Sequence, residues 1–577
     1  MVVEIPSPRF FEAEGRKIAA GGPRPKLSSN ERFLRHTSSV CPECYRLLPA
    51  IIFERDGAVY IRKECPDHGE FEEIYWGDVK MFKKAMKYEV PGRGITPHMK
   101  LKAPCPFSCG ICNAHLNSTA LANLVVTNRC NLDCWYCFFY AEKAGYVYEP
   151  SLEEIDKMVD LLINEKPAHG NAIQITGGEP TLREDLVEIV KLLKRKGIRH
   201  IQLNTQGIIF LEKPELMRQL REAGVNTIYL SFDGVTPEAN PKNHWEIPYI
   251  LEIARKSSMT SLVLVPTVIK GINDHEVGDM IRFAALNIDV IRGVNYQPVS
   301  LTGQMPRTER EKYRITIPDV IRKIEEQTNG EIYREAWYPV PFTVAISDFV
   351  EAVTGEPKLM MTNHPACGMA TYVFPEFEGA GMSRRIKRFV PITDFVDVEA
   401  LHDYLKQKAE EIRNGASRYL TLVKAVFNLY KFIDRKKQPK DLNLTGILRK
   451  ILLERSYKAL GEFHYKSLFL GMMHFMDLYN YDVQRVMRCN IHYLSPDGRV
   501  IPFCTYNVLS DIYRDKIIKE HSISLEEYER RYGKGLIGEE SKYKRDIRKL
   551  ESSEIYIRTY EPFFHKFRRV PAIARKS

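Results

Sequence analysis

The sequence lacks any apolar run long enough to cross a bilayer. A membrane-spanning helix needs about 20 consecutive apolar residues, whereas the longest candidates, residues 261–269 and 467–476, reach only about half that length. The first residues carry acidic and basic side chains without an apolar centre, so they do not resemble a secretory signal. We therefore expect a protein of the cytoplasm.

Cysteine is scarce over most of the chain. Twelve of the 577 residues are cysteines, and nine of these lie between positions 41 and 137. Secreted disulfide scaffolds are short and rich in cysteine throughout, so this clustering favours metal ligation. A strong charge of one sign is also lacking, because 84 basic minus 74 acidic residues leave a net charge of only +10. We expect this mild excess to serve solubility, and we expect no nucleic-acid partner.

The chain divides into five segments by composition and motif. They are an irregular N-terminal arm (1–37), a metal module resembling a rubredoxin or zinc ribbon (38–100), a Cys-rich linker (101–120), an α/β segment (121–300) and a C-terminal region (301–577). The last is expected to be mainly helical, with further cysteine ligands and binding surfaces.

The metal module is defined by two pairs of candidate ligands. Cys41 and Cys44 precede a predicted hairpin with Asp56-Gly57 at its turn, and Cys65 and His68 follow it. Thiolate-rich tetrahedral sites suit a single Zn or a rubredoxin-like Fe ion. Cys105 is an alternative to His68 as the fourth ligand.

Residues 121–300 alternate apolar strands with amphipathic helices. Such a pattern predicts a parallel sheet with right-handed crossovers. The predicted strands are 123–128, 172–176, 200–205, 227–232, 261–268 and 290–296. Ser151 and Glu154 form a capping box at the start of the first helix. Six strand–helix units suit a partial barrel, open on one side.

Three cysteines follow the first of these strands at close spacing. Cys130, Cys134 and Cys137 stand in the loop CNLDCWYCFFY. Three thiolates cannot surround a tetrahedral ion alone, but they can hold three irons of a [4Fe-4S] cube and leave the fourth iron open.

This loop and the strand ends after it resemble the radical S-adenosylmethionine (SAM) superfamily, whose CxxxCxxC loop follows the first strand of a partial (βα)6 barrel. The further matching residues are Tyr136 between the last two cysteines, Gly177, Gly178, Glu179 and Pro180 in ITGGEPTLR, Asn204 and Thr205 at the third strand, Ser231 and Asp233 at the fourth, and VIKGINDHE (268–276) at the fifth.

The resemblance implies a role for each match. The GGEP segment would bind the amino group of SAM, Ser231 and Asp233 would meet its ribose, and Tyr136 would back its adenine. Asn204 and Thr205 stand where SAM contacts are common. The open iron would chelate SAM, and reductive cleavage would give a 5'-deoxyadenosyl radical that abstracts hydrogen from a substrate. An electron donor of low potential is implied.

Two further sets of cysteines remain. Cys105, Cys109 and Cys112 repeat the CxxxCxxC spacing in a Pro-rich linker, but no strand precedes them. We expect them to bind an auxiliary cluster, with participation in the metal module or a structural role as alternatives. Cys367, Cys489 and Cys504 each lie beside turn-forming residues. Since some radical SAM subfamilies build an auxiliary [4Fe-4S] cluster from such C-terminal cysteines, one or two auxiliary clusters are expected.

The order of motifs along the whole chain resembles the archaeal tetraether lipid synthases. That resemblance implies coupling of the terminal methyl carbons of two phytanyl chains of archaeol lipids, with a C–C bond as the product. An archaeal lipid would then be the substrate, and the protein would contact the inner face of the membrane. The alternative is a radical SAM methyltransferase acting on a pterin precursor such as 7,8-dihydro-6-hydroxymethylpterin. A third possibility is an electron-carrying or nucleic-acid-binding protein without SAM chemistry.

Overall fold

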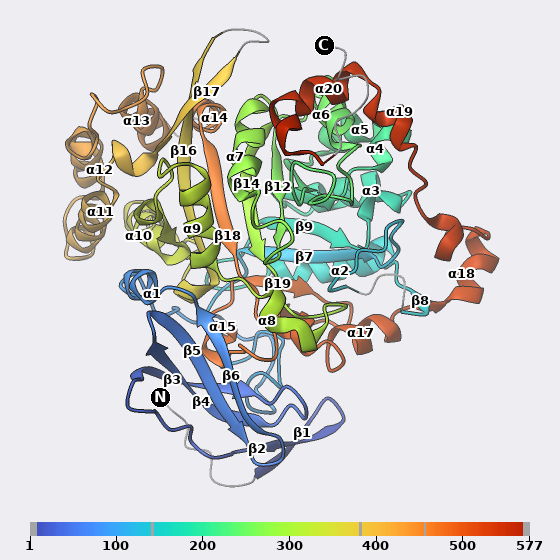
Figure 1. Ribbon diagram of the computed structural model, residues 1–577. Coiled ribbons are helices and arrows are strands. Elements are labelled where there is room, and N and C mark those ends of the chain that lie inside the picture. The colour runs from blue at the N-terminus through green and yellow to red at the C-terminus, as the bar shows by residue number, and fades with distance from the viewer. Residues whose placement is uncertain (1–8, 140–143, 380–383, 455–456, 569–577) are drawn as a thin grey trace.

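The computed structural model describes residues 9–139, 144–379, 384–454 and 457–568 (Figure 1). An N-terminal sheet lies below a much larger sheet that is covered by helices. Within the described residues, no helix has both the length and the apolar character needed to cross a membrane.

The N-terminal sheet has six strands, most of them antiparallel. They are β1 (Arg9–Ala13), β2 (Arg16–Ala20), β3 (Arg32–Val40), β4 (Leu47–Arg55), β5 (Ala58–Cys65) and β6 (Gly69–Trp76). The predicted hairpin is confirmed as β4 and β5, with positive φ at Asp56 and Gly57. Helix α1 (Val79–Met86) follows the sheet.

The expectation of an irregular arm over 1–37 is wrong for Arg9–Ala20 and from Arg32 onward, whereas residues 21–31 contain no helix or strand. Residues 1–8 lie outside the described chain. β1 and β2 pair as a hairpin through the two-residue turn Glu14-Gly15, where both residues have positive φ. Such a turn matches the twist of the strands it joins. Glutamate is an uncommon residue at that position, which is why the hairpin was missed.

The large sheet has at its centre the six parallel strands expected from the sequence. In chain order, and in the same order across the sheet, they are β7 (Leu121–Thr127), β9 (Ala172–Gly177), β10 (His200–Thr205), β11 (Thr227–Ser231), β12 (Leu262–Val265) and β14 (Ile291–Pro298). The crossover helices are α2 (Leu152–Ile163), α3 (Leu186–Arg195), α4 (Ile209–Glu212), α5 (Pro214–Ala223), α6 (Ile247–Lys256) and α7 (Val277–Leu286). The capping box of Ser151 and Glu154 is present at α2.

The C-terminal region extends this sheet at both edges. Beyond β14 lie β18 (Leu468–Met473), which is parallel to it, and then the antiparallel strand β16 (Gly368–Glu378). Beyond β7 lie the parallel strand β19 (Ile491–Leu494) and its hairpin partner β20 (Val500–Pro502). Among the described residues no pairing joins the two edges, so the sheet is a partial barrel rather than a closed one.

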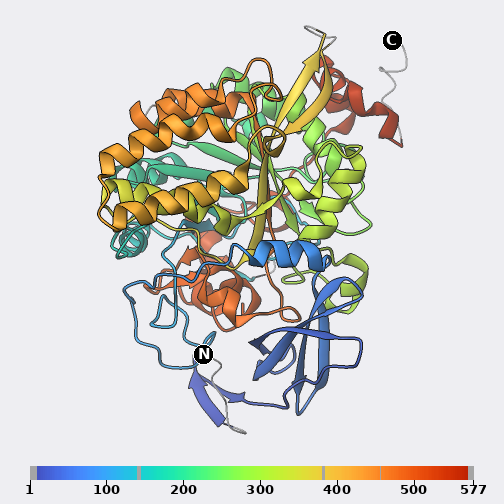
Figure 2. The same cartoon turned by 90° about the vertical axis from the view of Figure 1, so that its left-hand side faces the viewer.

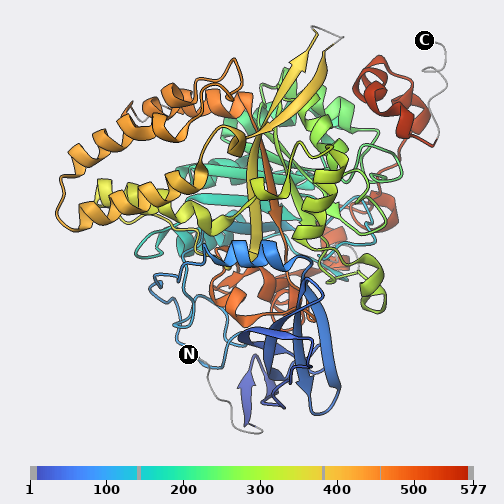
Figure 3. The same cartoon turned by 60° about the vertical axis from the view of Figure 1, so that its left-hand side comes forward.

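The remaining elements are short strands and helices. The strands are β8 (Tyr146–Val147), β13 (Thr267–Val268), β15 (Tyr338–Pro339), β17 (Arg385–Pro391) and β21 (Ile523–Ser524). The helices are α8 (Arg310–Tyr313), α9 (Ile317–Gln327), α10 (Val344–Thr354), α11 (Val398–Arg413), α12 (Arg418–Asn428), α13 (Leu444–Glu454), α14 (Tyr457–Lys466), α15 (Val483–Met487), α16 (Phe503–Val508), α17 (Arg514–Glu520), α18 (Leu525–Tyr532), α19 (Ile547–Glu551) and α20 (Glu554–Tyr560). Helices α11 to α14 project from the β16 side of the sheet (Figures 2 and 3).

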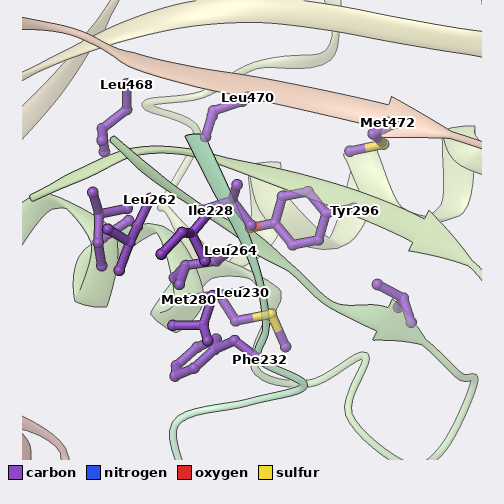
Figure 4. Packing of buried hydrophobic residues seen from close by; sticks show 14 of the residues in the cluster. Ile228, Leu230, Phe232, Leu262, Leu264, Met280, Tyr296, Leu468, Leu470 and Met472 are labelled. Carbon is purple, nitrogen blue, oxygen red and sulfur yellow. The ribbon is translucent and has the colours of Figure 1, made fainter. Parts of the chain in front are cut away.

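The two faces of the large sheet differ in chemistry because successive side chains of a strand point to opposite sides. One face is apolar and packs against the helices, as Figure 4 shows for Leu230 and Leu264 beside Met280. The other face lines the inside of the partial barrel. Its side chains include Gln174, Thr176, Gln202, Asn204, Tyr229, Ser231 and Asn295, each of which alternates with a buried apolar residue of the core.

Candidate active site

The loop with Cys130, Cys134 and Cys137 leaves the carboxyl end of β7 and lies against the end of β9. Gly178 donates its amide to the Thr127 carbonyl at 2.8 Å, and Glu179 donates to the Arg129 carbonyl at 2.7 Å. A Cβ on Gly178 would stand 2.1 Å from the Arg129 oxygen. The paired glycines are therefore required by the close approach of the two backbones.

Glu179 has a structural task that the resemblance did not imply. Its side chain is buried and accepts hydrogen bonds from the hydroxyls of Thr181 and Thr205, both at 2.6 Å, and from the amides of Thr181 and Gln206. Burial raises the pKa of this carboxyl, and the four donors oppose that rise. Glu179 thus joins the end of β9 to the end of β10, which leaves backbone groups of the GGEP segment to meet a ligand.

The residues expected at the other strand ends lie on the same edge of the sheet. Tyr136 donates its hydroxyl to Asp233, whose other carboxylate oxygen accepts from the Thr267 amide at 2.9 Å. Asn204 contacts Thr176 at 3.5 Å across two strands. Ser231 is the last residue of β11 and Asn204 the second-last of β10, and both lie on the inner face. The structure thus brings these positions together around the cysteine loop.

A small apolar cluster packs against Tyr136. The segment 268–276 contributes Ile269, which packs with Val299, Leu301 and Met305. Asn273 holds this segment in place by donating to the carbonyls of Asp233 and Thr267, both at 2.8 Å. An apolar wall with an aromatic ring suits the flat adenine of SAM.

Lys242 belongs to the same site, although no sequence motif indicated it. Its ammonium lies 2.9 Å from Asp233 and 5.3 Å from the centre of the Tyr136 ring, and its side chain is only 11% exposed. Burial raises the pKa of Cys134 to about 11, and the charge of Lys242 opposes this rise. A buried cation therefore stands between the expected ribose ligand and a cysteine of the cluster loop.

A C-terminal segment covers this site from outside the barrel. The amide of Tyr543 donates to the carbonyl of Asn131 in the cysteine loop at 3.0 Å. The Arg545 guanidinium donates to the carbonyls of Pro241 and Lys242 and to the buried carboxylate of Glu246. These contacts span some 300 residues of sequence, so no local pattern could have predicted them.

In the N-terminal sheet, the donor atoms of Cys41, Cys44, Cys65 and His68 all lie within 4.8 Å of one another. Cys44 Sγ is 3.9 Å from Cys65 Sγ, and His68 Nδ1 is 3.5 Å from Cys65 Sγ. Tetrahedral zinc with Zn–S bonds of about 2.3 Å places its ligands about 3.8 Å apart. The four groups fit one tetrahedral ion, and His68 rather than Cys105 occupies the fourth corner.

The first triplet forms a separate, buried group. Burial raises the pKa of Cys112, and Cys105, Cys109 and Cys112 influence one another electrostatically. Tyr513 donates its hydroxyl to the Pro106 carbonyl at 2.7 Å and accepts from the Cys109 amide at 3.3 Å. No strand precedes these cysteines, which agrees with a role other than SAM binding.

Cys367, Cys489 and Cys504 come together from distant parts of the chain. Cys504 and Cys367 both add to the rise in the pKa of Cys489, whose main cause is burial. Burial raises the pKa of Tyr481, and Cys109, Cys105 and Cys504 add to this rise, so Tyr481 is near cysteines of both sets. Their grouping favours a cluster and gives three separated free thiols no support.

Comparison with known proteins agrees with this geometry. The radical SAM superfamily matches residues 124–284, and the HMPTM N-terminal zinc ribbon domain matches residues 33–77. The 7,8-dihydro-6-hydroxymethylpterin dimethyltransferase of Methanocaldococcus jannaschii is 46% identical over 86% of this chain and 97% of its own length. The chain belongs to the family of that protein. It is a radical SAM protein with an N-terminal zinc ribbon.

More distant matches cover a smaller part of the chain. GTP 3',8-cyclase 3 of Mycobacterium bovis is 31% identical over 30% of this chain and 48% of its own length. The crystal structure of HydG, a maturase of the [FeFe]-hydrogenase, aligns with 37% of this chain and 50% of its own at a TM-score of 0.30 and 15% identity. That last likeness is too weak to support an argument.

The family corrects the expectation of a tetraether lipid synthase. The relative that matches almost end to end is named for a pterin, and none of these matches is named for a lipid. The assignments of an archaeol substrate, of phytanyl C–C coupling and of tetraether lipid biosynthesis are therefore wrong. Membrane contact was expected only because of the lipid, so that expectation loses its basis. The motifs did not distinguish the two substrates, because the same SAM barrel serves many reactions.

The donor groups fit the cofactors that the superfamily implies. Three cysteines in one loop suit a [4Fe-4S] cluster with an open iron, and the strand ends around it suit SAM. The ribbon suits a single metal ion, and the two other cysteine sets suit further metal or cluster binding.

Proposed function

We propose that this chain is a radical SAM methyltransferase acting on a reduced pterin related to 7,8-dihydro-6-hydroxymethylpterin. The observation that carries the proposal is the 46% identity to the Methanocaldococcus jannaschii dimethyltransferase over 97% of that protein. A match of such extent includes the ribbon, the barrel and the C-terminal region together.

The inner face of the barrel supports a polar heterocycle as substrate. Gln174 and Gln202 are directly opposite each other on β9 and β10, and Asn295 lies on β14 at the level of Ser231. The Gln202 side-chain oxygen is buried without a hydrogen-bond partner among the described residues. Amide groups match the donors and acceptors along the edge of a pterin, whereas a lipid chain would leave the Gln202 oxygen unpaired.

We assign the residues of the site as follows. Cys130, Cys134 and Cys137 would hold the cluster, which supplies one-electron cleavage of SAM when both are bound. Backbone groups at Gly177, Gly178 and Pro180 would face the methionine part. Asp233 and Ser231 would accept the ribose hydroxyls, and Lys242 would hold Asp233 in place through their ion pair.

The remaining contacts keep water out and hold the ligand still. Tyr136 and Ile269 form the wall against which adenine would lie. The Tyr543–Arg545 segment covers the loop from outside. A low-potential protein or chemical reductant is required, because cleavage of SAM consumes an electron.

The test is an anaerobic reaction of the reconstituted protein with SAM carrying a deuterated methyl group, a low-potential reductant and 7,8-dihydro-6-hydroxymethylpterin. We expect 5'-deoxyadenosine and methionine from the SAM that supplies the radical. A second SAM would donate each methyl group and leave S-adenosylhomocysteine, so the pterin should gain one or two deuterated methyl groups, all detected by mass spectrometry. Formation of 5'-deoxyadenosine with an unaltered pterin would contradict the proposed substrate.

A further inference from the structure

The C-terminal cysteines lie where β16, β18 and α16 meet. Cys367 immediately precedes β16, and its Sγ accepts a hydrogen bond from Arg485 Nε at 3.3 Å. Cys504 lies in α16, and its Sγ accepts from the Met476 amide at 3.5 Å. Cys489 follows α15 and donates to the Ile491 carbonyl at 3.0 Å. The segment after β18 therefore runs between Cys367 and Cys504.

Three thiolates leave this site one ligand short. A [4Fe-4S] cluster is ordinarily held by four protein ligands, and a structural zinc ion also takes four. A SAM-cleaving cluster leaves one iron without a protein ligand so that SAM can bind there. That reason does not apply here, because the SAM motifs lie at the other cysteine loop. A fourth donor should therefore stand beside the three cysteines.

His474 has the properties of that donor. Its side chain is 2% exposed, and neither Nδ1 nor Nε2 has a hydrogen-bond partner within the described chain. A buried polar group left without a partner costs about 1–3 kcal/mol. An unpartnered ring nitrogen of a buried imidazole is free to bind a metal.

The strand register places His474 directly beside Cys367. β16 and β18 are antiparallel, with Gly368 opposite Met473 as the last pair of the ladder. The next pair in the same register is Cys367 and His474, and the His474 amide donates to the Cys367 carbonyl at 3.0 Å. Cys367 ends the 3-10 turn Pro365–Cys367, and this hydrogen bond holds its backbone against that of His474 at the end of the ladder.

The other candidate donors nearby are already engaged. Asp477 forms a buried ion pair with Arg314 at 2.8 Å. His115 contacts both the Cys489 carbonyl and the His492 ring at 3.0 Å. The two ring nitrogens of His364 meet the Ala366 amide and the Arg35 guanidinium.

We propose that His474 is the fourth ligand of a metal centre formed with Cys367, Cys489 and Cys504, and that this centre is an iron–sulfur cluster with mixed thiolate and imidazole ligation. The site does not depend on the pterin substrate, so failure of the pterin reaction would leave it intact. A neutral imidazole in place of a thiolate raises the reduction potential of such a cluster. The centre would therefore accept electrons more readily than one with four cysteines.

The test uses the full chain in a background in which Cys130, Cys134 and Cys137 are replaced by alanine, which removes the SAM-cleaving cluster. The protein is labelled with 15N-histidine, reconstituted with iron and sulfide, reduced, and examined by pulsed EPR. We expect the strong 15N coupling of a directly bound imidazole. His474→Ala should abolish it, and His474→Cys should restore the iron content with a more negative midpoint potential.

The matched control is His364→Ala, since His364 is also buried near Cys367 but has both ring nitrogens partnered. It should retain the coupling. Absence of a bound 15N signal in this triple-alanine background, when its iron content shows that the remaining clusters are loaded, would overturn the proposal without any His474 variant having to fold. Persistence of the signal in His474→Ala would overturn it as well.

Discussion

Single side chains around the cysteine loop determine how the SAM site is arranged. Lys242 pairs with Asp233, which also receives Tyr136 and the Thr267 amide. Glu179 uses its carboxylate to join two strand ends. The residues expected to touch SAM are therefore themselves held by buried neighbours that no motif marks.

Replacing Lys242 with methionine should weaken SAM binding about tenfold or more, because a buried Asp233 would lose its cation. Equilibrium dialysis of the reconstituted protein measures the Kd. Lys242→Arg should retain most of the affinity, and Lys256→Met, at an exposed position, should have no effect. Unaltered affinity in Lys242→Met would exclude Lys242 from the site.

The two CxxxCxxC triplets should respond differently to mutation. Cys130→Ser should abolish the reductive cleavage of SAM, since the cluster loses a ligand beside the SAM pocket. Cys109→Ser should leave measurable cleavage, because its site lies apart from the strand ends. Formation of 5'-deoxyadenosine provides the readout, with the iron content of each variant as control. Equal loss in both, with the other clusters intact, would refute the distinction.

Glu165 should make stability depend on pH. Its carboxyl is buried against Thr119, and burial raises its pKa from 4.5 to about 7. Because the folded state holds this proton more tightly than the unfolded state, the contribution is complete below pH 4.5 and is lost as pH rises to about 7. The loss amounts to about 3 kcal/mol. Denaturant titrations of Glu165→Gln should lack this slope, whereas the exposed control Glu153→Gln should keep it.

At the scale of whole elements, β18 and β19 widen the sheet formed by the six central strands, and the C-terminal segment covers the site at their ends. β18 and β19 extend the sheet at opposite edges and carry the surroundings of His474 and Cys489. The Tyr543–Arg545 segment connects the cysteine loop to the loop that holds Lys242. Sequence periodicity predicted the central strands, but it could not predict these partners from far along the chain.

Arg545→Ala should loosen the cover over the SAM site. The guanidinium donates to two backbone carbonyls and to Glu246, and it lies 4.9 Å from the Trp245 ring. We expect faster hydrogen exchange in residues 241–246 and SAM binding several-fold weaker. Arg558→Ala removes only an exposed arginine and serves as the control. Equal exchange in both variants would show that Arg545 does not secure this cover.

At the scale of the whole molecule, the zinc ribbon contacts the loop 476–482, which lies beside the C-terminal cysteines. Thr37 and Tyr75 of the ribbon donate to Asp482, and Ser39 donates to the Tyr481 carbonyl at 2.6 Å. Buried Lys63 donates to the Leu478 carbonyl at 2.5 Å. The loop 476–482 therefore has its shape fixed partly by the ribbon.

Loss of the ribbon metal should disturb the C-terminal site more than the SAM site. In Cys41→Ser/Cys44→Ser the ribbon loses the ion that stabilises its fold, and the loop beside Cys504 loses its partners. We expect a lower midpoint of thermal unfolding and an altered EPR signal from the C-terminal cluster. The SAM-cleaving cluster provides an internal control in the same sample. An unaltered C-terminal signal would show that the two sites are independent.

The sequence alone determined the ribbon ligands, the SAM-cleaving loop and the order of the central strands, because each depends on local spacing or on periodicity within a few residues. The tertiary structure decided the rest. The hairpin at Glu14-Gly15, the Lys242–Asp233 pair, the cover by Arg545 and the place of His474 beside Cys367 all depend on contacts between residues that local patterns do not connect. Motifs predicted the wrong substrate, because enzymes with different substrates share the strand ends that bind SAM. The polar inner face of the barrel is formed only when the strands are assembled into the sheet.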